Sequence, residues 1–193
     1  LNPEMPLFRE ARYLLADEPD IRDPAPYHSV LAAIASGNST WGGIANYVGR
    51  QSAQIAHPMA VLEDSGLVAR EPDLLRPGRS QYRITEPLIS FYQSIIRPAW
   101  TRLELGLGAD VWKEARQRFS STVMGPHFEH VCREYVASSG AAAFDEPVGA
   151  VGSGAVNDPG ARLQIDVDVV VLAPAEGTER RRIVSLGEAK WGK

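Results

Sequence analysis

The chain has 193 residues, which fits one large domain or two small ones, and 44% of them are hydrophobic, enough to bury a core. Its 20 basic and 24 acidic residues exclude a uniformly basic protein that coats nucleic acid but leave room for a local basic patch. The single cysteine, Cys132, excludes an internal disulfide, and without a signal-peptide pattern or a membrane-length apolar run we expect a cytoplasmic protein with no membrane partner.

Residues 1–26 precede the first predicted domain. The stretch "LFREARYLLADE" carries an apolar stripe with helical spacing, and the prolines of "PDIRDPAP" end it. We interpret this segment as a linker and helix. The chain begins without methionine and stops three residues after Lys190. We therefore expect a piece of a longer polypeptide, whose last sheet is incomplete at the C-terminus and shows an exposed edge or apolar face.

Residues 27–100 have the pattern of a winged helix-turn-helix domain. "YHSVLAAIASGN" predicts a helix that Gly37 ends, and "STWGGIANYVGR" predicts a second helix with Thr40 as its N-cap. "QSAQIAHPMAVLEDSG" predicts a third, which ends at Gly66. A hairpin follows, with "LLRPGRS" as the turn and "QYRIT" as the returning strand. Three short helices and a small hairpin are typical of this fold.

The third helix of that pattern would be the recognition helix. Polar side chains at its start and arginines on the hairpin could reach phosphates and base edges, and the predicted DNA-binding residues are Arg50, Gln51, Ser52, Gln54, His57, Arg76, Arg79 and Arg83. We expect Arg50 and Arg79 to share one exposed face. Pro58 predicts that the helix either kinks there or begins near His57. The alternative is a winged helix that binds proteins instead of DNA.

The pattern of residues 101–193 predicts a second domain. With this domain, the whole chain is expected to have an α+β fold. "GADVWKEARQRFSSTVM" and "GPHFEHVCREYVASSG" have amphipathic helical patterns. The Gly-rich "DEPVGAVGSGAVNDPGAR" predicts a mobile loop. "LQIDVDVVVLA" alternates with period two as a strand does, and "IVSLGEAK" predicts its hairpin partner.

Four residues of this second domain form a candidate active site. Asp168 lies among valines in the middle of a strand, where a buried carboxylate needs a partner. The next strand ends in Glu188 and Lys190, whose side chains point to the same face if the strand continues. Glu129 lies on the preceding helix, where a helix N-terminus alone would also favour a carboxylate.

This combination predicts metal-dependent phosphodiester chemistry. Asp168, Glu188 and Glu129 would hold Mg²⁺ or Mn²⁺ through hard oxygen ligands, and Lys190 would act on the nucleophile or the transition state. Three carboxylates without a metal repel one another, so at least one should have a raised pKa. The alternative is a surface ion pair of Glu188 and Lys190, with Asp168 hydrogen-bonded for structural reasons.

The chain resembles the C-terminal region of a family of prokaryotic, archaeal-type AAA P-loop ATPases, in which a winged helix precedes a domain similar to PD-(D/E)XK nucleases. The resemblance covers nearly the whole chain, through "PLFREARYLL", "YHSVLAAIASGNSTWGGIA", "LEDSGLVARE", "SQYRITEPLISFYQSIIRP", "GPHFEHVCREYV", "IDVDVVV" and "GEAKWGK". It implies that Glu129, Asp168, Glu188 and Lys190 match the family's site residues. Asp166 stands where the family usually has glutamate.

The resemblance implies three segments: residues 1–26 as the linker after an ATPase core, 27–100 as the winged helix, and 101–193 as a truncated restriction-endonuclease-like domain. The expected function is a DNA-binding, Mg²⁺-dependent nuclease-like module attached to the ATPase domain of the same polypeptide. No Walker A pattern occurs in the chain, so ATPase activity would belong to residues outside it. The alternative is a non-catalytic winged-helix regulator, binding DNA or protein, with a degenerate nuclease fold.

Overall fold

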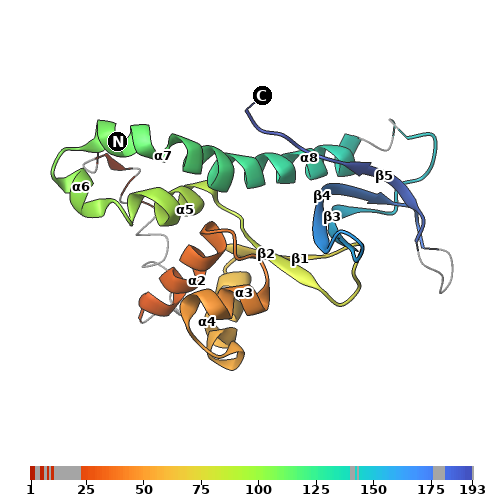
Figure 1. Cartoon of the computed structure of the whole chain (residues 1–193), viewed down its shortest axis with the longest axis horizontal. Helices are drawn as coiled ribbons and strands as arrows, with labels where there is room; N and C mark the ends of the chain where they lie inside the picture. The colour runs from red at the N-terminus through yellow and green to blue at the C-terminus, as the bar shows by residue number, and fades with distance from the viewer. Residues whose placement is uncertain are drawn as a thin grey trace. The chain divides into compact units, whose positions relative to one another are not determined.

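The structure is a computed structural model that describes residues 1, 2, 5, 6, 8, 10, 23–139, 142, 144–175 and 181–192. It is a mixed α+β chain, as predicted (Figure 1). Contacts divide it into two compact units. The helical unit comprises Leu1–Arg70 and Tyr82–Met124, and the sheet unit comprises Glu71–Gln81 and Gly125–Lys193. Most of the helix predicted in residues 7–18 lies outside the described residues.

Residues 25–84 form three α-helices and then a hairpin, in the predicted order. The helices are α2 (Ala25–Ala35), α3 (Trp41–Val48) and α4 (Ala56–Asp64), and the hairpin strands are β1 (Val68–Pro72) and β2 (Ser80–Ile84). Thr40 caps α3 as predicted, because its hydroxyl oxygen accepts from the N–H of Gly43 at 3.2 Å. Gly49 ends α3 with a φ of 69°, a conformation that favours glycine.

The position at which the third helix begins explains how it accommodates Pro58. A 3₁₀ turn, η1 (Ser52–Ile55), comes first, and α4 begins at Ala56. Pro58 is therefore the third residue of α4, in the first turn, where an N–H has no partner inside the helix. The expectation that the helix begins near His57 is confirmed, and no kink is needed. The core of this part consists of fully buried apolar side chains, among them Leu31, Ile44, Ile55, Met59 and Leu62.

After β2, the helical unit continues with a series of helices in residues 87–124. They are α5 (Pro87–Phe91), the π-helix η2 (Tyr92–Ile96), α6 (Trp100–Glu104), α7 (Gly108–Arg118) and the π-helix η3 (Phe119–Met124). A second apolar cluster joins Phe8, Tyr92, Ile96, Leu103 and Val111. Contacts thus place residues 101–124 with the helical unit, whereas the predicted boundary fell at residue 100, and the predicted domain limits remain predictions.

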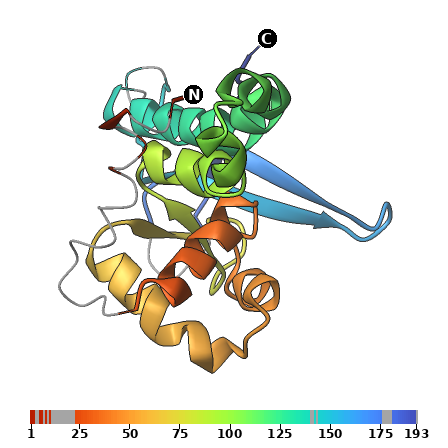
Figure 2. The same ribbon diagram turned by 90° about the vertical axis from the view of Figure 1, so that its left-hand side faces the viewer.

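The sheet unit combines one long helix with a three-stranded antiparallel sheet. The helix is α8 (Gly125–Ser139), and the strands are β3 (Ala150–Asp158), β4 (Leu163–Leu172) and β5 (Ile183–Gly187), in the order β3-β4-β5. α8 packs against β3 and β4. β3 and β4 run side by side as a long hairpin (Figure 2). Among the described residues β5 pairs with β4 alone, and Leu186 on β5 is 52% exposed. The expectation that the sheet is incomplete stays a prediction.

The Gly-rich segment of residues 145–162 was predicted as a mobile loop, but its central part forms β3 (Ala150–Asp158). The tip of the β1–β2 hairpin packs on two glycines of this strand. A Cβ atom on Gly152 would lie 2.9 Å from Leu74 Cδ1, and one on Gly154 would lie 2.7 Å from Leu75 Cγ. Real Cβ contacts are longer than this, so a larger residue at either position would require the leucine side chain to shift. The N–H of Leu74 also donates to the carbonyl of Ser153 at 3.0 Å.

Asp73 holds this hairpin tip on β3. Its side chain is only 2% exposed. Oδ1 accepts from the backbone N–H groups of Leu75 (3.0 Å), Arg76 (2.9 Å) and Ala155 (3.3 Å), and Oδ2 accepts from Arg76 Nε at 2.9 Å. The carboxylate thus organises the turn and joins it to the sheet. Among the described residues no helix is both long and apolar enough to cross a bilayer.

Candidate functional site

Asp168 and the segment after β5 lie side by side. The antiparallel register pairs Val169 with Gly187, so Asp168 and Glu188 are the next pair along the two strands. The N–H of Ala189 donates to Asp168 Oδ2 at 2.8 Å. This bond fixes Glu188, Ala189 and Lys190 next to Asp168, although the ladder itself ends at Gly187. The predicted proximity of these residues is therefore present.

Glu129 comes close to the same place from the first turns of α8. Its side chain is half-buried, and burial, together with the negative charge of Asp168, raises the pKa of its carboxyl. The charges of Arg133 and Lys190 partly oppose this rise in pKa. The expectation that one carboxylate has a raised pKa is confirmed. Burial is the larger cause, however, whereas the sequence argument rested on repulsion between carboxylates.

Glu188 and Lys190 form a direct ion pair on the surface. Their side chains are 67% and 55% exposed. The hydrogen bond and the charge of Glu188 raise the pKa of Lys190, and Asp168 and Glu129 act in the same direction more weakly. Next along the chain, the ring of Trp191 lies 5.7 Å from that of Phe128 on α8. This contact keeps the segment near α8.

A metal ion would have two carboxylates near each other rather than a complete cluster of three. Among the described residues no group of three or more His, Cys, Asp and Glu side chains is arranged to hold an ion. Glu188 contacts Lys190 instead. The carboxyl oxygens of Glu129 and Asp168 are hard ligands, and Mg²⁺ is commonly held by one or two carboxylates plus water and phosphate. Two carboxylates are thus the kind of ligand that Mg²⁺ takes, and the metal site itself, with Glu188 as a third ligand, remains a prediction.

Sequence reasoning missed Arg133, which connects this site to the hairpin. Arg133 is 9% exposed. Its Nη1 donates to the backbone carbonyl of Asp168 at 3.0 Å, and its Nη2 donates to Glu71 Oε2 at 3.2 Å. Its spacing in the sequence could have indicated a place near the site. Arg133 lies four residues after Glu129 and therefore shares its helix face.

A cavity of about 220 Å³ lies beside Arg133 in the sheet unit. The hairpin, α8 and β3 supply its walls, which include Glu71, Leu74, His130, Ala137 and Gly152. Glu129, Asp168 and Glu188 do not line it. The carboxylate site and the cavity are therefore separate features that share Arg133.

The predicted DNA-binding residues of the helical unit differ in their exposure and in whether their side chains already have hydrogen-bond partners. Arg50, Gln51 and Ser52 are exposed around the start of η1. Gln54 is also exposed, but its Oε1 accepts from the N–H of Gln51 at 3.0 Å and so caps the 3₁₀ turn. His57 Nε2 lies 3.4 Å from the hydroxyl of Tyr27. Gln51 is the partner of Gln54 in the capping box of η1. Arg50 and Ser52 are thus the exposed polar groups best placed for a ligand.

The three arginines of the hairpin also differ in exposure and in hydrogen-bond partners. The guanidinium of Arg76 binds Asp73, and its Nη1 also donates to Asn157 Oδ1 at 3.3 Å and Gln164 Oε1 at 3.0 Å, so it is engaged within the sheet unit. Arg83 is half-buried and donates to the carbonyl of Ile84 at 3.2 Å. Arg79 is exposed. Arg50 and Arg79 belong to different units, and their shared face stays a prediction.

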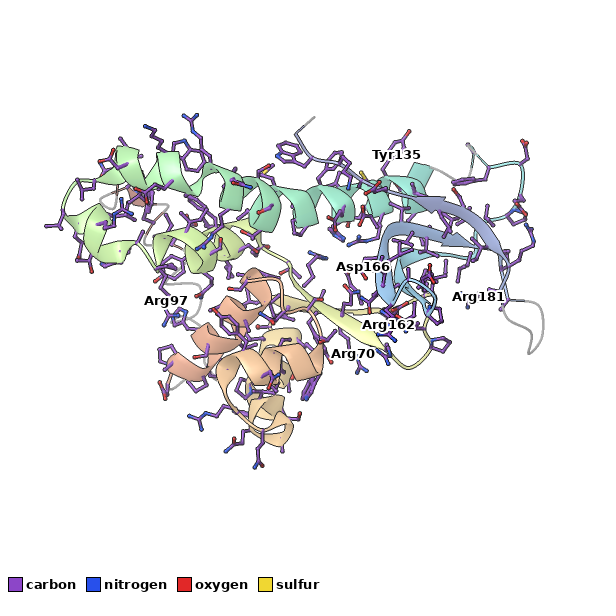
Figure 3. The ribbon with its side chains drawn as sticks, viewed as in Figure 1. Arg70, Arg97, Tyr135, Arg162, Asp166 and Arg181 are labelled. Carbon is purple, nitrogen blue, oxygen red and sulfur yellow. The ribbon has the colours of Figure 1, made fainter. Side chains whose placement is uncertain are left out.

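Asp166, the first aspartate of the "DVD" stretch, is not part of the carboxylate site. It lies on β4 (Figure 3), is exposed, and accepts from Gln164 Nε2 at 2.8 Å through Oδ1. It therefore offers a control of matched charge for Asp168.

Comparisons with known proteins give distant similarities. No family model matches the chain. An uncharacterized protein of Methanocaldococcus jannaschii, MJECL04, is 27% identical over 120 residues, which are 61% of this chain, and the chain spans only 27% of that relative's length. A solved structure of a Staphylococcus aureus MepR mutant bound to an oligodeoxyribonucleotide is similar over 60% of this chain and 86% of that one, with 19% identity and a TM-score of 0.35. A likeness at that TM-score carries no argument about fold or ligand, so the function has to be argued from the site.

Proposed function

We propose that this chain is a DNA-binding, Mg²⁺-dependent nuclease-like module. The supporting observation is the hydrogen bond from Ala189 N–H to Asp168 Oδ2, which holds Lys190 near two carboxylates from different elements. Glu129 and Asp168 would hold Mg²⁺ or Mn²⁺, with Glu188 as a further ligand after release from Lys190. When bound, the metal supplies charge neutralisation at a phosphate and a more acidic water.

Lys190 would act on the phosphate in this proposal. A lysine amine is protonated at neutral pH, and Lys190 needs only to exchange a surface partner, Glu188, for a phosphate oxygen. Solvent screens this exposed pair, so the exchange costs little. Arg50, Gln51, Ser52 and Arg79 would contact the DNA. The proposal extends to an ATPase domain in the same polypeptide, as the family resemblance implies.

Thermal unfolding with and without metal tests the metal site directly. Mn²⁺ or Mg²⁺ at about 100 times its dissociation constant should stabilise the fold by about 2.7 kcal/mol. Asp168→Asn should abolish this stabilisation, whereas Asp166→Asn, with the same charge change on the same strand, should keep it. Lys190→Ala should keep the metal response and lose cleavage of plasmid or single-stranded DNA. Equal metal responses of the wild type and Asp168→Asn would sink the proposed metal site.

A second candidate is a non-catalytic regulator that binds DNA or a protein. The observation that favours it is the pairing of Glu188 with Lys190, which leaves the described carboxylates short of a three-ligand cluster. This candidate predicts binding without any response to Mg²⁺ or Mn²⁺. Binding of DNA by the wild type with identical melting curves in metal and in chelator would favour it over the nuclease.

A further inference from the structure

The strand that carries Asp168 is irregular at that residue. β3 and β4 pair Gly152 with Val170 and then Gly154 with Val167, so Asp168 and Val169 lie opposite a single residue of β3. This is a β-bulge, which interrupts the ladder and redirects side chains. Without a further contact, the ladder alone would leave the position of Asp168 poorly defined.

Arg133 supplies a contact at this bulge. Its guanidinium bridges the carbonyl of Asp168 (3.0 Å) and the carboxylate of Glu71 on β1 (3.2 Å). The two acceptors come from segments 97 residues apart in the chain (168 − 71), and Arg133 is 9% exposed. A planar guanidinium can donate to two acceptors in fixed directions, whereas a lysine ammonium acts as a point charge.

We propose that Arg133 is a positioning residue, which holds the bulge of β4 so that the carboxylate of Asp168 meets the N–H of Ala189. Glu71 anchors the guanidinium through its other terminal nitrogen, Nη2. The consequence for metal binding rests on the proposed function, whereas the positioning of Asp168 does not. Arg133 therefore acts through Asp168.

The charge of Arg133 and its geometry make opposite predictions for metal binding. A fixed cation near Glu129 and Asp168 repels a second cation, so removing the charge alone would strengthen metal binding. Loss of positioning would weaken it. Arg133→Lys separates the two effects, because it keeps the charge and loses the planar fork.

Amide hydrogen exchange of the folded chain tests the positioning without metal. In Arg133→Lys, exchange of the Ala189 N–H should be at least about tenfold faster than in the wild type, while that of Val171 in the middle of β4 stays unchanged. Glu71→Gln should give a smaller change in the same direction. Arg182→Lys is the matched control, because Arg182 pairs with Glu146 on the surface of the same unit and should leave both amides unchanged.

Mn²⁺ titration of the same variants supplies the second measurement. Arg133→Lys should bind Mn²⁺ about tenfold or more weakly, and Arg182→Lys should bind as the wild type does. Unchanged exchange of Ala189 in both Arg133→Lys and Glu71→Gln would overturn the positioning role. If the wild type itself does not bind Mn²⁺, the proposed metal function fails, and a faster exchange of Ala189 in Arg133→Lys would still support the positioning role.

Discussion

Asp73 offers a sharp test of the way the hairpin packs on the sheet. Replacement by alanine removes the acceptor of three backbone N–H groups and of the Arg76 guanidinium. Leu75 and Arg76 are half-buried, so water can satisfy their amides. Ala155 is 1% exposed, and its amide would lose a partner where water does not reach.

The magnitude follows from these groups. An unsatisfied buried donor costs about 1–3 kcal/mol, and a hydrogen bond to a charged group contributes about 1.5–3 kcal/mol. We therefore expect Asp73→Ala to lower the free energy of unfolding of the sheet unit by about 3–5 kcal/mol. Asp73→Asn keeps an oxygen for the amides but loses the charge, and should cost about 1–2 kcal/mol.

Urea unfolding, followed by circular dichroism and by exchange of the Ala155 amide, measures this loss. Asp158→Ala is the matched control, because Asp158 is exposed and accepts from two turn amides, those of Gly160 and Ala161. It should cost less than about 1 kcal/mol. The packing argument is refuted if Asp73→Ala and Asp158→Ala lose the same stability.

Two further predictions concern charge. Since burial and Asp168 raise the pKa of Glu129, the folded chain holds this proton to a higher pH than the unfolded chain, and stability falls as pH rises from the ordinary value through the raised one. In Glu129→Gln the melting temperature should fall less over this pH range, and above the range it should be higher than that of the wild type. If the melting temperature of the variant depends on pH as that of the wild type does, Glu129 is not the cause of the fall. Arg50→Ala and Arg79→Ala should each reduce the salt slope of DNA binding by about one, measured by fluorescence anisotropy, and an unchanged slope would exclude a phosphate contact.

The sequence by itself determined the features that depend on neighbours in the chain. Thr40 and Gly49 delimit a helix through local hydrogen bonds and backbone preference. The period-two pattern around Asp168 and the short connection to the next strand brought Asp168 next to Glu188, because strands joined by a hairpin pair in antiparallel register.

Only the tertiary structure decided the features that depend on distant segments. The glycines around Gly152 led to the prediction of a loop, because no local pattern shows that Leu74 packs over them. No local pattern indicated two of the partners of Arg76, Asn157 and Gln164, because they are 81 and 88 residues away in the chain. The sequence around Arg133 indicated only the helix face on which it lies. Its proposed positioning role depends on a β-bulge and on Glu71, which is 62 residues away. Periodicity reports which face of an element is buried, whereas the partner that buries it is chosen by long-range packing.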